Sequence, residues 1–109
     1  MKKSTIEINI SLDEKSLPEN IFWQNRSEGA GQDAKAMLVS FFDKESLETL
    51  KIDLWTKDMQ INEMDRFMYH SLRGLADTYF NATRNQKLAT EMRKFVQYFG
   101  EQTEILAKE

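Results

Sequence analysis

The chain of 109 residues contains no cysteine and a single histidine, His70. Without cysteine, disulfide bonds, thiolate nucleophiles and sulfur-ligated metal sites are excluded, and the composition fits a reducing compartment. A zinc or iron site is also disfavoured, because one imidazole cannot supply the set of ligands that such ions take. We therefore predict that no metal is bound.

Long hydrophobic runs are also missing. No stretch approaches the roughly 20 apolar residues that a membrane-spanning helix needs. Two lysines follow Met1, as in the basic region of a signal peptide, but Glu7, Asn9 and Ser11 interrupt the apolar run that would have to follow. We expect a cytoplasmic protein without membrane insertion.

An excess of positive charge is absent as well. The 15 Lys and Arg residues face 18 Asp and Glu residues, which gives a net charge of −3. Nucleic acids are therefore not expected partners, because phosphate binding needs clustered Lys and Arg. A hydrophobic content of 40% over this length is enough for one hydrophobic core, and we predict a single domain over residues 1–109.

The first half of the chain has the alternation of β-strands. Apolar and polar residues alternate along residues 5–12, which indicates a strand with one solvated face. Short apolar segments predict further strands over 21–24, 34–42 and 47–55, and the glycine-bearing segment 26–33 is expected to be a loop. Since 34–42 is apolar on both faces, we expect it at the centre of the sheet. Four sequential strands with short links favour an antiparallel sheet.

The second half changes to a helical period. Asn62 is expected to cap a helix, and Asn85 to end it in a left-handed conformation. A second helix is predicted from residue 87 to about 107. Apolar residues form one stripe on each helix: Met64, Phe67, Met68, Leu72, Leu75 and Tyr79 on the first, and Leu88, Met92, Phe95, Val96, Phe99 and Leu106 on the second.

These patterns predict an α+β fold. The sheet would occupy about residues 5–58 as four mostly antiparallel strands. The helices would occupy about 62–107 and pack on one face of the sheet as a C-terminal hairpin.

No arrangement of catalytic residues is evident. The acidic pairs Asp13/Glu14 and Asp43/Glu45 lie in predicted turns, where carboxylates favour turn formation and solubility. Glycines 29 and 31 lack the lysine and the strand–turn–helix context of a phosphate loop. We therefore predict no enzyme activity, no catalytic residue and no cofactor.

A polar strip on the first predicted helix is open to two interpretations. It carries Arg66, His70, Arg73, Asp77 and Arg84, and the four-residue spacing of Arg73 and Asp77 suits an ion pair. The strip is either an ordinary solvated face or a partner-binding face, since arginine suits the recognition of carboxylates. Beside it, Tyr69, Ala76 and Phe80 either contact the second helix or extend such an interface.

Two tryptophans are further candidates. In the alternation of the last strand, Trp55 points away from Leu54, toward the face of Lys51 and Asp53. It could pack at the corner between sheet and helices. Alternatively it could join Trp23, Phe41 or Phe42 in an exposed aromatic patch, which would mark a binding surface or a dimer contact.

The chain resembles the gliding-motility protein C family (GldC) of Bacteroidetes. The resemblance rests on segments in the family's order over nearly the whole length: Pro18–Trp23, the specific run IDLWTKDM (Ile52–Met59), Leu75–Thr78, Met92–Phe95 and Tyr98–Phe99. It implies a cytoplasmic accessory factor of gliding motility in organisms that couple movement to a dedicated secretion machine. The family implies no reaction, cofactor or catalytic residue.

Two functions follow as hypotheses. The first is an interaction module that binds gliding or secretion components, with the following candidate partner-binding residues: Trp23, Trp55, Lys57, Asp58, Arg66 and Arg73. The alternative is a holdase chaperone similar to SecB, whose order of strands and helices the prediction resembles. A homodimer is compatible with either function, because neither proline nor inward-facing lysine guards the predicted sheet edges.

Overall fold

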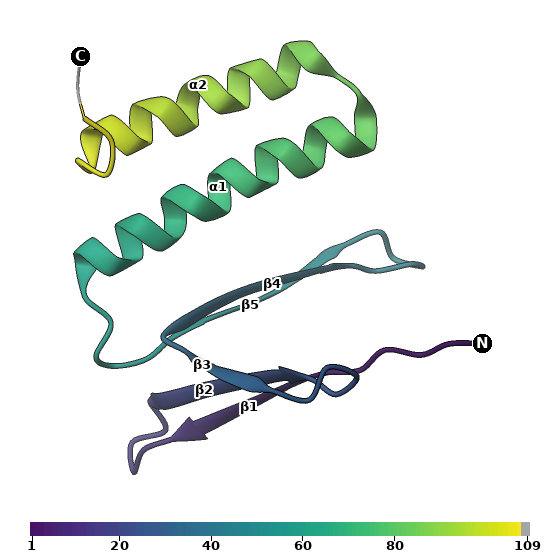
Figure 1. Cartoon of the computed structure of the whole chain (residues 1–109), viewed down its shortest axis with the longest axis vertical. Coiled ribbons are helices and arrows are strands. Elements are labelled where there is room, and N and C mark those ends of the chain that lie inside the picture. The colour runs from purple at the N-terminus through teal and green to yellow at the C-terminus, as the bar shows by residue number, and fades with distance from the viewer. Residues whose placement is uncertain (108–109) are drawn as a thin grey trace. The chain divides into compact units, whose positions relative to one another are not determined.

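The computed structural model describes residues 1–107 and divides the chain into two compact units, Met1–Met59 and Gln60–Glu109. The first unit holds all the strands and the second holds two helices, as the ribbon in Figure 1 shows. The predicted α+β class is therefore confirmed.

The first unit consists of five strands in two antiparallel sheets. A three-stranded sheet has the order β1–β2–β3, and a two-stranded sheet pairs β4 with β5. The strands are β1 (Ile6–Leu12), β2 (Pro18–Asn25), β3 (Gly31–Ala34), β4 (Ala36–Phe42) and β5 (Thr49–Trp55). The prediction of a single four-stranded sheet is therefore wrong in the number of strands and in the number of sheets.

The extra strand is β3, which lies partly in the segment expected to be a loop. Its residues are polar or small, but they pair with β2 from Gly31 opposite Gln24 to Ala34 opposite Ile21. The ring of Phe22 lies so close over Gly31 that a Cβ there would be 2.2 Å from the ring. This close packing accounts for a glycine within the strand, where the sequence pattern resembles a loop.

The three-stranded sheet has one apolar face. Ile8 faces Trp23 and Ile10 faces Ile21 across the β1–β2 ladder. Ile21 is only 1% exposed and is the largest fully buried side chain of the described residues. The predicted strand over 5–12 and its alternation are confirmed.

The β4–β5 hairpin is in regular register, with Val39 opposite Ile52 and Phe41 opposite Leu50. The predicted faces of both strands are confirmed. The central position expected for 34–42 is wrong, because β4 pairs with β5 alone among the described strands. β5 begins at Thr49 rather than at residue 47, because Leu47 adopts a left-handed conformation (φ 61°) in the turn.

The second unit is a hairpin of α1 (Ile61–Thr83) and α2 (Gln86–Gln102). The predicted caps need correction. Gln60, not Asn62, caps α1 in a capping box with Glu63. Arg84, not Asn85, takes the left-handed conformation (φ 59°), while the Asn85 side chain accepts a hydrogen bond from Leu88 N–H and caps α2.

α2 also ends earlier than expected, because Glu104 adopts a left-handed conformation (φ 63°) and the N–H of Leu106 donates to the carbonyl of Gly100. That bond satisfies a carbonyl which the helix would otherwise leave free.

Small side chains let the two helices approach each other. Ala76 of α1 and Ala89 of α2 are fully buried, with Tyr69 and Val96 beside them. The guanidinium of Arg93 on α2 lies 5.6 Å from the ring centroid of Phe80 on α1. Of the two interpretations of Tyr69, Ala76 and Phe80, contact with the second helix is confirmed. That the helices cover one face of the sheet stays a prediction.

Two glycines of the helical unit should respond oppositely to alanine. A Cβ on Gly100 would lie 2.7 Å from both Tyr69 Cε1 and Leu106 Cδ1, whereas a Cβ on Gly74 has open space around it. Gly74→Ala should raise the free energy of unfolding by about 0.5–1 kcal/mol, because alanine loses less backbone entropy in a helix. Gly100→Ala should lower it by about 1–2 kcal/mol, because overpacking outweighs that gain. Denaturant unfolding followed by helical circular dichroism checks both; equal effects of the two changes would contradict the helix packing.

Candidate functional site

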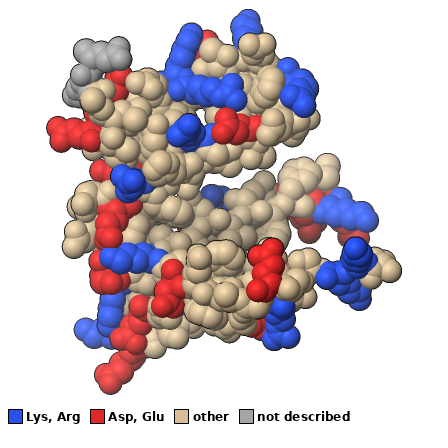
Figure 2. All heavy atoms as spheres, in the orientation of Figure 1, with Lys and Arg blue, Asp and Glu red and all other residues tan. Residues whose placement is uncertain are grey.

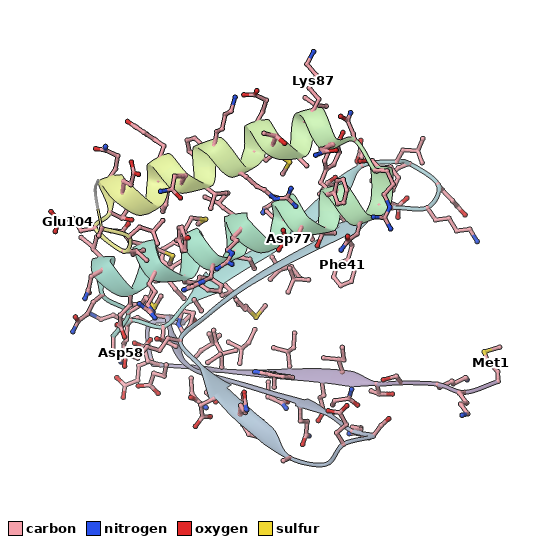
Figure 3. The ribbon with its side chains drawn as sticks, turned by 45° about the horizontal axis from the view of Figure 1, so that its top comes forward. Met1, Phe41, Asp58, Asp77, Lys87 and Glu104 are labelled. Carbon is pink, nitrogen blue, oxygen red and sulfur yellow. The ribbon has the colours of Figure 1, made fainter. Side chains whose placement is uncertain are left out.

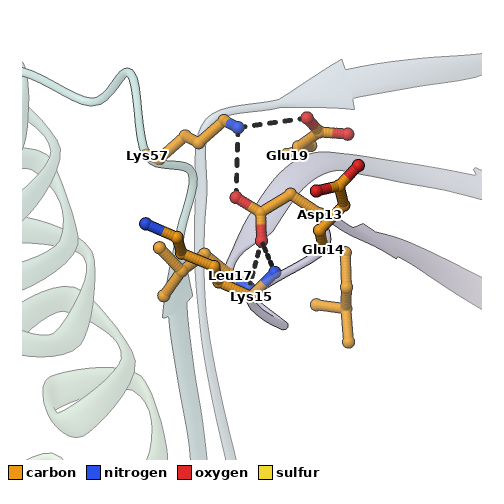
Figure 4. Close-up of a pocket in the computed structure, with 7 residues that line it drawn as sticks. Asp13, Glu14, Lys15, Leu17, Glu19 and Lys57 are labelled. Carbon is orange, nitrogen blue, oxygen red and sulfur yellow. Dashed lines mark hydrogen bonds and ion pairs between the residues drawn. The ribbon is translucent and has the colours of Figure 1, made fainter.

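Lys57 lies at the centre of a charged cluster in the first unit. Its Nζ donates to Asp13 Oδ2 and to Glu19 Oε1, each at 3.1 Å (Figure 4). We call Lys57, Asp13 and Glu19 the Lys57 cluster. Glu19 and, second, Asp13 raise the pKa of Lys57, so that the amine stays charged.

Asp13 is fixed by a turn as well as by the ion pair. Its second carboxylate oxygen accepts hydrogen bonds from the backbone N–H groups of Lys15 (2.8 Å) and Leu17 (3.0 Å). The bond from Leu17 and then the one from Lys57 hold the pKa of Asp13 below its usual value. The β1–β2 turn therefore presents a carboxylate in one defined direction.

The residues after β5 connect the two sheets of this unit. The N–H of Thr56 donates to the carbonyl of Lys35 (2.7 Å), and the N–H of Lys57 donates to the carbonyl of Pro18 (3.0 Å). Thr56 is buried, and its hydroxyl donates to Asp58 Oδ1, which lowers the pKa of Asp58. The segment predicted to join strand and helix thus also joins the end of β5 to the start of β2.

Two hollows adjoin Lys57. The larger has a volume of about 620 Å³, and most of the residues that line it are charged: Leu12, Asp13, Glu14, Lys15, Leu17, Glu19 and Lys57. The smaller, of about 350 Å³, is mainly apolar and is lined by Leu17, Pro18, Asp53, Leu54, Trp55 and Lys57. We call the second one the Trp55 hollow.

The two tryptophans lie on different sheets. Trp55 is 56% exposed on the hairpin face that also carries Phe42, opposite the face of Phe41. Trp23 is 41% exposed on the apolar face of the three-stranded sheet. That Trp55 packs at the corner between sheet and helices stays a prediction.

The arginine strip on α1 is exposed but does not form the expected pair. Asp77, labelled in Figure 3, binds Arg93 of α2 at 3.1 Å instead of Arg73. The reason is that α2 brings a guanidinium onto this side of α1. Neither Arg66 nor Arg73 makes an ion pair within residues 1–107. As predicted, His70 is exposed, with its ring edge-on to Tyr69.

Charges of both signs are interspersed on the face drawn in Figure 2. Among the described residues, no group of three or more His, Asp or Glu could hold a metal ion. In the same part of the chain, no helix is long and apolar enough to cross a membrane.

Sequence reasoning found Lys57 and Trp55 but missed their neighbours. The sequence predicts a turn role for Asp13 and no role for Glu19, whereas the fold brings both to Lys57, about 40 residues away along the chain. The turn signal at Asp13 was visible in the sequence, but the single-sequence pattern contained no sign of its long-range partner.

Acid should destabilise the first unit through Asp13. Its folded pKa lies below the ordinary value of 3.8, so its stabilising contribution is present above that value and is lost as the pH falls through the folded pKa. Asp13→Asn keeps the turn but removes this titration. Its thermal midpoint should therefore fall less steeply than that of the wild type below about pH 4. Tryptophan fluorescence reports this unit selectively, since Trp23 and Trp55 both belong to it.

The matched control is Glu14→Gln, since Glu14 makes no hydrogen bond or ion pair within residues 1–107. This variant should follow the wild-type acid profile. An Asp13→Asn profile that coincides with the wild type would contradict the assigned role of Asp13.

Comparison with known protein families agrees with the family resemblance seen in the sequence. A family model described as "gliding motility-associated protein GldC-like" matches residues 18–105, which include β2 to α2 and the whole of the Trp55 hollow apart from Leu17. Searches of curated proteins and of solved structures returned no match.

Proposed function

Because the chain belongs to the GldC-like family of gliding motility-associated proteins, we propose that it is a non-enzymatic cytoplasmic interaction module of gliding motility and its secretion machinery. It would bind a protein component through the surface formed by the Trp55 hollow and the Lys57 cluster. Trp55, Lys57 and Asp58 from the candidate set lie in or next to this surface, and the roles of Trp23, Arg66 and Arg73 stay predictions.

The Trp55 hollow is the observation that carries the proposal. An exposed tryptophan beside Leu17, Pro18 and Leu54 offers a concave apolar surface. Binding energy at protein interfaces is concentrated in such positions, where an aromatic side chain is desolvated inside a polar rim.

The Lys57 cluster supplies the rim. The amine is already oriented by two carboxylates, so a partner that uses it need not order a free lysine side chain. The neighbouring Glu14 and Lys15 in the larger hollow add charges of both signs. Such an arrangement favours one orientation of the partner more than it adds affinity.

Substitutions of Trp55 and Lys57 test the proposal. In a gliding bacterium, crosslinked pull-down of the tagged protein should recover a few motility or secretion components. Trp55→Ala should reduce this recovery at least tenfold, because truncation of a central interface residue costs more than about 1.4 kcal/mol. Lys57→Ala should reduce it less, because the amine lies on the rim. Mass spectrometry quantifies the recovered components.

The matched control is Phe42→Ala. Phe42 is on the same face of the hairpin and is even more exposed than Trp55, but it lies at the other end of the strand pair and lines neither hollow. Full recovery with Trp55→Ala and Lys57→Ala together would refute the proposed surface, provided that the circular dichroism of the variant is unchanged.

A holdase is the second candidate, favoured by the apolar face of the hairpin. Phe41 and Leu50, which face each other on it, are 59% and 60% exposed, and Figure 3 shows Phe41 projecting from this face. An interaction module should leave the aggregation of an unfolded test protein unchanged at an equimolar ratio, as measured by light scattering. Suppression that disappears with Phe41→Ser would instead favour the holdase.

A further inference from the structure

One edge of β5 is open, and the hydrogen bonds of the hairpin identify its free groups. Asp43 N–H donates to the carbonyl of Glu48 at one end of the β4–β5 ladder, and Thr56 N–H donates to Lys35 at the other. Because hydrogen-bonded and non-hydrogen-bonded pairs alternate in an antiparallel ladder, Ile52 and every second residue direct their backbone groups to β4. The N–H and C=O groups of Lys51 and Asp53 therefore point to the other edge.

No strand within residues 1–107 pairs with that edge. An isolated two-stranded hairpin is marginally stable in water, and either a further strand or packing against a helix stabilises it. Two devices that often protect an open edge are missing from β5, since the strand contains no proline and its ladder shows no bulge, although it carries the charged side chains of Lys51 and Asp53. In contrast, β1 carries a bulge between Ser11 and Leu12, and β3 has only four residues.

We propose that the edge of β5 pairs with β5 of a second copy of this chain, antiparallel and centred on Ile52. The two hairpins then form one four-stranded sheet with the order β4–β5–β5–β4. Leu50 lies opposite Leu54 of the second copy, and Ile52 lies opposite Ile52 on the two-fold axis. The apolar faces of the two hairpins become continuous, which is the isologous arrangement of most homodimers.

The charges on β5 select this register. The side chains of Lys51 and Asp53 lie on the same face of the strand, with 3.5 Å between Lys51 Nζ and Asp53 Oδ2. With Ile52 on the axis, Lys51 of each copy lies opposite Asp53 of the other. A slip of two residues in either direction places Lys51 opposite Lys51 or Asp53 opposite Asp53, and like charges in this position are destabilising. A slip of one residue joins the apolar face of one copy to the polar face of the other.

The pairing can be tested separately from the proposed partner-binding surface. The paired segment, from Leu50 to Leu54, shares Asp53 and Leu54 with the lining of the Trp55 hollow, whereas Trp55 and Lys57 lie outside the segment. Trp55→Ala and Lys57→Ala, which test partner binding, should leave the dimer intact, and the two proposals can therefore fail separately.

Charge reversal tests the pairing and its register. The wild-type chain should have twice its 12.8 kDa mass in sedimentation equilibrium at micromolar concentration. Lys51→Asp and Asp53→Lys should each weaken the dimer at least tenfold, and the double variant should restore it. Lys44→Asp in the hairpin turn changes the net charge as Lys51→Asp does and should leave the mass unchanged. A monomeric wild type, or a dimer that both single variants preserve, would overturn the proposal.

A disulfide tests the position of the axis. The chain contains no cysteine, and Ile52 occupies a non-hydrogen-bonded position on the open edge. Its Cα would lie about 4.5 Å from that of the second copy, within the range of roughly 4.4–6.8 Å that a disulfide spans. Ile52→Cys should therefore form a covalent dimer under mild oxidation. The control is Val39→Cys, on the neighbouring strand and the same face, which should not. Absence of the Ile52→Cys crosslink from a dimeric sample would place the interface elsewhere and overturn the proposal.

Discussion

The first unit depends on the short segment Thr56–Lys57, which joins two sheets that share no strand pair. Thr56 N–H binds Lys35 at the point where β3 gives way to β4, and Lys57 N–H binds Pro18 at the start of β2. The side chain of Lys57 also forms ion pairs with Asp13 in the β1–β2 turn and with Glu19 in β2. The ion pairs are exposed and add little free energy, so the backbone bonds hold the segment and the ion pairs set its direction.

That constraint also creates the candidate site. With the end of β5 bound to the start of β2, Leu17 and Pro18 lie beside Leu54 and Trp55, and the apolar hollow forms between them. The same contact leaves Trp55 exposed at the end of its strand, while the edge of β5 from Leu50 to Leu54 runs free. The partner surface and the proposed dimer edge thus derive from one feature of the fold and meet at Asp53 and Leu54.

The sequence predicted what local patterns determine. The alternation in β1, the two faces of β4 and β5, and the two helices are all present, because period and side-chain burial are local properties. The sequence-based prediction was wrong where the local structure depends on a residue that is distant in the sequence or on another element. In β3, Gly31 lies under the ring of Phe22 from the neighbouring strand, and Asp77 binds Arg93 because α2 lies beside α1. At the site, IDLWTKDM identified Lys57 and Trp55, but no pattern in a single sequence connects Lys57 to Asp13 and Glu19.

We propose that a motility or secretion component contacts the chain at Trp55. This contact can be measured with a photo-crosslinking phenylalanine analogue placed at position 55 in a gliding bacterium, with the same analogue at position 42 as the reference. The proposed surface predicts a crosslink to a discrete motility or secretion protein from position 55 and none to that protein from position 42. Equal crosslinking from both positions, or none from position 55 in cells that still glide, would contradict it.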